Sequence, residues 1–136
     1  IIQPYTSVDK IPIDVKDCGG KERPDVLWDR EDRIVILEID EDQHKSRPCE
    51  CEQVRMINIS QALGSERTIW IRYNPDAFQG NSKKWTPNKR HLLLKEWLQH
   101  VFSVDLTTLG PISVVYLFFD DFSEADVKIL TLSPQC

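Results

Sequence analysis

The chain contains an apolar run that becomes acidic only at its carboxyl end, "RIVILEIDEDQH" over residues 33–44. In a strand, alternate side chains point to opposite faces. Residues 34–40 would therefore place on one face Ile34, Ile36, Glu38 and Asp40, and on the other Val35, Leu37 and Ile39. Because both faces are apolar at the start, we expect a central strand that is covered on both sides, with a functional site at its polar carboxyl end.

Five further segments carry secondary-structure patterns. A short strand at 23–29 precedes the central strand and pairs with it as a hairpin. Helices are expected at 49–64, where Gly64 ends the helix, and at 88–103, where Pro87 lies near the start. The remaining segments are strands at 68–74 and 111–120, with a loop at 75–87. The order β-β-α-β-α-β predicts an α/β fold with a helix-flanked mixed sheet.

The length of 136 residues fits one compact domain with a substantial core. We expect residues 23–136 to form this domain and the polar residues 1–22 to be a lead-in or linker. No apolar run approaches the ~20 residues that cross a membrane as a helix, so we expect no membrane partner. The chain begins at Ile1 rather than at Met, so we expect a fragment or a domain cut from a longer protein.

The four cysteines, Cys18, Cys49, Cys51 and Cys136, do not follow the spacing of a secreted disulfide framework. We therefore expect reduced thiols in an intracellular compartment, the cytoplasm or the nucleus. In a second interpretation, the first three cysteines and His44 hold a structural Zn²⁺, although their spacing matches no standard zinc motif.

Carboxylates are expected to converge where the hairpin ends. The dipeptide "PD" places Asp25 on the first strand, and "ExD", after 12 intervening residues, places Glu38 and Asp40 on its neighbour. Such a group of like charges is unfavourable unless a cation lies in it. Mg²⁺ fits best, with Mn²⁺ as the alternative, because Mg²⁺ accepts a few carboxylate oxygens and keeps waters that a phosphate can displace. His44, four residues past Asp40, is then placed to take a proton or to contact a phosphate oxygen.

These residues resemble a known family. The stretches "RPDV", "ILEIDEDQH", "CECEQVRMINISQALG" and "TIWIRYNPD" are similar to the PD-(D/E)xK nuclease superfamily, which has the restriction-endonuclease-like fold. More narrowly, they resemble the branch of very-short-patch-repair and related homing endonucleases, and proteins of large DNA viruses and algae. The likeness covers residues 23–76, and the rest only by element order. It is carried by Glu38, Asp40, Gln43, His44, Glu52, Arg55, Gly64 and Arg72.

The resemblance implies a DNA endonuclease in which Asp25 and Glu38 are metal ligands. It implies that Asp40 is a further ligand or positions the site, and that His44 is a base or a phosphate contact. Asp40 stands where the superfamily motif has its lysine, so no ammonium group is present there to stabilise the charge that develops on the phosphate. That charge would have to be balanced by a second metal ion or by a nearby side chain, His44, Arg55 or Arg72.

The remaining candidates surround this site. Glu52 and Arg55 would support it together with Gln43; in the plainer interpretation, Glu52 and Arg55 are a surface pair worth ~0.3 kcal/mol. Phosphate contacts are expected from basic side chains before and after the site, Lys45, Arg72, Lys83, Lys84, Lys89 and Arg90, which otherwise form a solvated face. The net charge of −5 argues against a protein that coats nucleic acid, but it does not exclude a local basic groove.

We therefore expect a domain that hydrolyses DNA phosphodiester bonds with Mg²⁺ or Mn²⁺. Two alternatives stay open. One is a binding module that keeps the fold without the chemistry, which the absent lysine permits. The other is an enzyme that acts on RNA or on another phosphate compound. The sequence does not decide whether the domain forms a homodimer to cut both strands.

Overall fold

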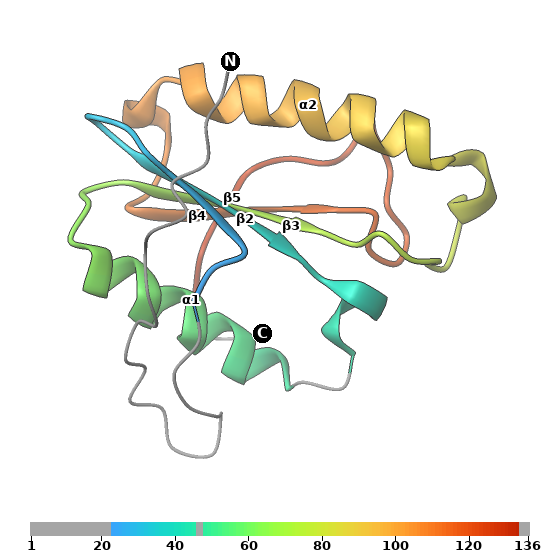
Figure 1. Ribbon diagram of the computed structural model, residues 1–136, viewed down its shortest axis with the longest axis horizontal. Helices are drawn as coiled ribbons and strands as arrows, with labels where there is room; N and C mark the ends of the chain where they lie inside the picture. The colour runs from blue at the N-terminus through green and yellow to red at the C-terminus, as the bar shows by residue number, and fades with distance from the viewer. Residues whose placement is uncertain (1–22, 46–47, 134–136) are drawn as a thin grey trace.

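The computed structural model describes residues 23–45 and 48–133, in which a mixed sheet carries one helix on each face (Figure 1). The strands lie side by side in chain order, as β1 (Val26–Asp29), β2 (Ile34–Ile39), β3 (Thr68–Tyr73), β4 (Ile112–Leu117) and β5 (Leu130–Thr131). The three middle strands are parallel, whereas β1 and β5 are antiparallel to their neighbours. The two helices are α1 (Cys49–Leu63) and α2 (Pro87–Ser103). The chain is thus a mixed α/β protein.

Each helix covers its own hydrophobic core. Met56 of α1 and Ile36 of β2 belong to the core on one face, whereas Leu93 of α2 and Val35 of β2 belong to the core on the other. The central strand β2 is therefore buried on both sides, as its two apolar faces predict. Because of this burial, a polar side chain at the carboxyl end of β2 destabilises the fold unless it forms a hydrogen bond or an ion pair.

The helix ends follow from local sequence. Gly64 caps α1 in the left-handed conformation, with φ of 72°, as predicted. Pro87 is the first residue of α2, one residue earlier than expected, and the Thr86 hydroxyl accepts a hydrogen bond from the backbone N–H of Lys89. Both helices are therefore fixed by residues at their ends as well as by packing.

The predicted order stops one strand too early. The two-residue strand β5 pairs with β4, and its exposed residues leave no periodic pattern in the sequence. The expected loops contain the short 3-10 helices η2 (Ser82–Lys84) and η3 (Leu106–Thr108). They also contain η1 (Glu41–His44), a tight turn whose backbone angles at Asp42 and Gln43 are not helical. The strands expected at 68–74 and 111–120 end earlier, at Tyr73 and Leu117.

The expected lead-in, residues 1–22, lies outside the described residues, and so do Cys18 and Cys136. None of the helices within 23–45 and 48–133 has the length and apolar composition that crossing a membrane requires.

Candidate functional site

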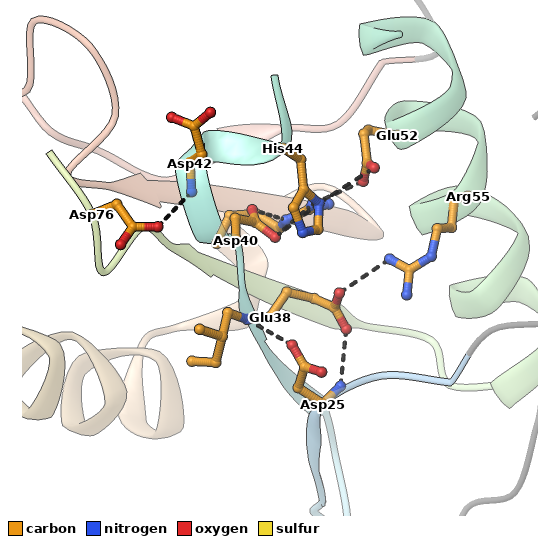
Figure 2. A network of polar contacts seen from close by, with 10 residues as sticks. Asp25, Glu38, Asp40, Asp42, His44, Glu52, Arg55 and Asp76 are labelled. Atoms are coloured by element: carbon orange, nitrogen blue, oxygen red, sulfur yellow. Dashed lines mark hydrogen bonds and ion pairs between the residues drawn. The ribbon is translucent and has the colours of Figure 1, made fainter. Parts of the chain in front are cut away.

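Asp25 and Glu38 lie next to each other where β1 begins and β2 ends (Figure 2). The backbone N–H of Asp25 donates to Glu38 Oε1 at 3.0 Å, and the backbone N–H of Ile39 donates to Asp25 Oδ2 at 2.7 Å. These two bonds continue the antiparallel pairing of the strands through their side chains. The structure thus brings together the two carboxylates that the sequence places on neighbouring strands.

Glu38 is a buried carboxylate whose charge is only partly balanced. Its side chain meets Arg55 of α1, whose Nη1 donates to Glu38 Oε2 at 3.2 Å. Burial raises the pKa of Glu38, and the positive charges of Arg55 and Arg72 offset only part of this effect. Repulsion from Asp25 adds to the rise in pKa. A further positive charge at this place would therefore stabilise the ionised form.

Asp40 does not join these two carboxylates. It is fully buried, and both its oxygens bind Arg72 of β3, with Nε to Oδ2 at 2.6 Å and Nη2 to Oδ1 at 2.9 Å. Within residues 23–45 and 48–133, no three or more His, Cys, Asp or Glu side chains are grouped so that they could hold a metal ion. The expected cluster of Asp25, Glu38 and Asp40 is not formed, because the guanidinium group of Arg72 pairs with Asp40 in the place expected for a metal ion.

Arg72 is the centre of a second group of charges beside the first. Its Nη2 also donates to Glu52 Oε2 at 2.8 Å and lies 3.2 Å from His44 Nδ1. Burial lowers the pKa of Arg72, but the hydrogen bonds and charges of Asp40 and Glu52 outweigh burial and hold this pKa above its usual value. Arg72 is only 2% exposed, so it is a fixed internal cation, and the predicted phosphate contact does not fit its placement.

His44 joins this group through one ring nitrogen. Its Nδ1 lies 3.3 Å from Asp40 Oδ1 and 3.4 Å from Glu52 Oε1 (Figure 2). The other nitrogen, Nε2, forms no hydrogen bond with a described residue. A cavity of about 410 Å³ opens beside the ring, with Lys45, Tyr116 and Phe119 in its wall. A ring that is held at Nδ1 and open at Nε2 is suited to proton transfer.

The predicted phosphate-binding residues divide into two kinds. Lys83, Lys84 and Lys89 are exposed around η2 and the start of α2. Lys45 is exposed as well and lies 3.5 Å from a carboxylate oxygen of Asp120. Arg90, in contrast, is 6% exposed, and its guanidinium group donates to the main-chain oxygens of Asn74, Asp76 and Trp85. The predicted phosphate contact does not fit Arg90, because its donors hold the loop after β3.

The expectation of free thiols is wrong for the two cysteines of α1. Cys49 and Cys51 are both disulfide-bonded, and the described part of the chain contains no free cysteine. A sulfur in a disulfide is not the thiolate that binds zinc. The proposed Zn²⁺ site with His44 therefore lacks these two ligands.

Alkylation tests this cysteine state. Iodoacetamide is expected to leave Cys49 and Cys51 unmodified in protein purified without reductant, because a disulfide sulfur is no nucleophile. After reduction and unfolding, both should be alkylated, which serves as the control. Peptide mass spectrometry separates the two states, and carbamidomethyl groups on either residue before reduction would contradict the structure.

Sequence reasoning missed two acidic residues of this edge of the sheet. Asp76 Oδ2 accepts a hydrogen bond from the backbone N–H of Asp42 at 2.8 Å (Figure 2). Asp120 binds the side chain of Gln43. A signal was present for Asp120, because it ends the predicted strand 111–120 and so occupies the same end of a parallel strand as Asp40.

No family model, curated protein or solved structure matches the chain.

Proposed function

We propose that this domain hydrolyses phosphodiester bonds in DNA with Mg²⁺ or Mn²⁺, on a restriction-endonuclease-like fold. The observation that carries this proposal is the contact of Asp25 with Glu38 at the end of a central, helix-covered strand. Mg²⁺ binds through one or two carboxylates and keeps several waters, so these two residues meet its requirement. Asp25 Oδ1 accepts no hydrogen bond from another described residue and is available as a ligand.

Arg55 is the competitor of a metal ion at Glu38. It takes Oε2, whereas Oε1 accepts one hydrogen bond from the Asp25 backbone and retains a lone pair. The donor set therefore fits a divalent ion that shares Glu38 with Arg55. Such an ion would polarise the phosphate and acidify a bound water.

The other residues of the site have separate roles in this proposal. Asp40 holds Arg72 and His44 in place and is a positioning residue rather than a metal ligand. Glu52 supports the same arrangement from α1. His44 accepts a proton at Nε2. Backbone phosphates of the substrate are neutralised by the exposed lysines, which are Lys45, Lys83, Lys84 and Lys89.

Replacement of His44 separates proton transfer from metal binding. His44→Ala is expected to lower kcat for plasmid nicking by about 10²–10⁴-fold, the usual contribution of general acid–base catalysis. Its affinity for Mn²⁺ in calorimetry should not change, because the ring is no metal ligand in this scheme. His91→Ala, an exposed histidine of α2, is the matched control and should nick DNA normally. Normal nicking by His44→Ala would remove its catalytic role.

A binding module without catalysis is the second candidate, and one observation favours it. Arg55 and Arg72 already balance much of the charge of Glu38 and Asp40. A module of this kind would take up neither Mg²⁺ nor Mn²⁺ in calorimetry and would bind DNA without cutting it. An enzyme that acts on RNA would instead cut the RNA in a cleavage panel of single-stranded DNA, duplex DNA and RNA.

The location and the oligomeric state stay predictions. The cytoplasm or the nucleus was expected for a protein with reduced thiols. The disulfide-bonded state of Cys49 and Cys51 counts against a reducing compartment, because such bonds persist in oxidising surroundings. A homodimer would carry two copies of this site and could cut both strands of a DNA duplex.

A further inference from the structure

Between β2 and α1, three consecutive residues, none of them glycine, adopt left-handed backbone angles. The φ angle is 51° at Asp42, 57° at Gln43 and 53° at His44. This region is sparsely populated by residues other than glycine, and a run of three is rarer than a single one. Such a turn persists only where its surroundings hold it against relaxation.

The side chain of Gln43 forms two hydrogen bonds with Asp120, which we call the Gln43–Asp120 clasp. Gln43 Nε2 donates to Asp120 Oδ1 at 3.0 Å, and the backbone N–H of Asp120 donates to Gln43 Oε1 at 2.7 Å. Asp120 Oδ1 accepts a further bond from the backbone N–H of Gln79 at 2.8 Å. Asp120 therefore ties together the loops that follow β2, β3 and β4.

The clasp acts at the middle of the strained turn. The two ends of the turn are held by backbone groups, since Gln43 N–H donates to Asp40 O at 2.9 Å and Lys45 N–H donates to Asp42 O at 3.1 Å. Neither bond fixes the side chain of Gln43. The backbone N–H of Asp42 donates to Asp76 Oδ2 at 2.8 Å and ties the start of the turn to the loop after β3. Among the described residues, the clasp is what ties Gln43, at the centre of the turn, to the loop after β4, and His44 is the next residue along the chain.

We infer that Gln43 and Asp120 are positioning residues, whose clasp holds the left-handed turn so that His44 stays on Asp40 and Arg72. Without the clasp, the turn relaxes toward right-handed angles, and the changed backbone turns the His44 ring out of its contacts. For its effect on catalysis this inference rests on the proposed function. Its effect on the turn itself does not.

Three variants and one matched control test the clasp. Gln43→Ala removes both hydrogen bonds of the clasp. Asp120→Ala removes the clasp bond that Oδ1 accepts, together with the contact of Oδ2 with Lys45, but keeps the bond from the Asp120 backbone N–H. Asp120→Asn keeps an acceptor oxygen and should rescue. Gln79→Ala removes an exposed amide side chain from the neighbouring loop but keeps both backbone bonds of Gln79.

Amide hydrogen exchange measures the turn directly. In Gln43→Ala and Asp120→Ala, the Lys45 amide should exchange about tenfold faster or more, because the turn that protects it opens locally. Nuclear Overhauser contacts between the His44 ring and Glu52 should weaken as well. The amides of β3 should remain protected. Asp120→Asn and the control should match the natural chain in all three readouts.

Cleavage measures the consequence for the proposed function. Gln43→Ala and Asp120→Ala should lower kcat by about 100-fold, the effect of a misplaced catalytic group, with KM unchanged. Unchanged exchange at Lys45 and unchanged His44 contacts in both variants would overturn the inference, as would an equal loss of protection in β3. If the natural chain cuts no DNA, the proposed function fails, and the exchange measurements still decide the clasp.

Discussion

Asp25→Asn is expected to slow DNA cleavage by more than about 100-fold and to weaken Mn²⁺ binding by a similar factor, since even supporting residues of metal sites contribute 10–100-fold. The variant removes one of the two carboxylate charges that would hold the ion. Its fold should survive, because Asp25 is exposed and an asparagine oxygen can still accept the Ile39 N–H. Single-turnover plasmid nicking and calorimetry measure the two effects.

Asp29→Asn is the matched control for this experiment. Asp29 is an exposed aspartate at the far end of the same strand, β1, and it lies away from Glu38. It should cleave DNA and bind Mn²⁺ like the natural chain. If Asp25→Asn nicks plasmid at the natural rate, the metal-dependent mechanism is wrong.

Glu38→Ala should abolish cleavage as well, but its result is harder to interpret. Glu38 is 3% exposed and is the partner of Arg55 at 3.2 Å. Removing it changes a buried ion pair together with the metal site, and breaking such a pair is destabilising. Asp25 forms no ion pair within the described residues, which makes it the better probe.

The largest effect on stability is expected at the Asp40–Arg72 pair. Asp40→Leu or Arg72→Met alone should lower the free energy of unfolding by about 3–5 kcal/mol, because each leaves a buried charge without its main partner. The double variant should lose clearly less than the sum of the two, because it removes both charges at once. Urea unfolding of the three variants provides the cycle.

A surface carboxylate gives the control for these unfolding measurements. Glu96→Ala changes an exposed residue of α2 and should alter the free energy of unfolding by no more than about 0.5 kcal/mol. Additive losses in the double variant would show that Asp40 and Arg72 do not act as a pair. A loss below about 1 kcal/mol in both single variants would show that the pair is not buried as described.

The sequence predicts the core of the fold because its signal is periodic. The alternation in residues 34–40 identifies both faces of β2, and the hairpin spacing brings Asp25 to Glu38. Both inferences use contacts that are set by neighbouring strands. Pairing of this kind can be derived from local pattern and turn length.

The partners of the buried carboxylates could not be derived in the same way. Asp40 meets Arg72 across 32 positions of sequence, and Glu38 meets Arg55 across 17. Which side chains meet over such separations depends on how α1 packs on the sheet and on the register of β2 and β3. No local sequence pattern determines either. The sequence therefore predicted a metal ion for a group of carboxylates whose charge is partly balanced by arginines.

The turn at Asp42, Gln43 and His44 was hidden for a different reason. A left-handed conformation is normally signalled by glycine, and none is present there. Its stability comes from the clasp with Asp120, 77 positions away. The bonding of Cys49 and Cys51 was likewise hidden, because disulfide connectivity cannot be deduced from spacing.

Anomalous diffraction from a crystal soaked in Mn²⁺ tests the central claim most directly. The proposal predicts a strong anomalous peak between the carboxylates of Asp25 and Glu38, and no such peak in the Asp25→Asn variant. A crystal in which Arg55 still covers Glu38 and no peak lies beside Asp25 at saturating Mn²⁺ would contradict it.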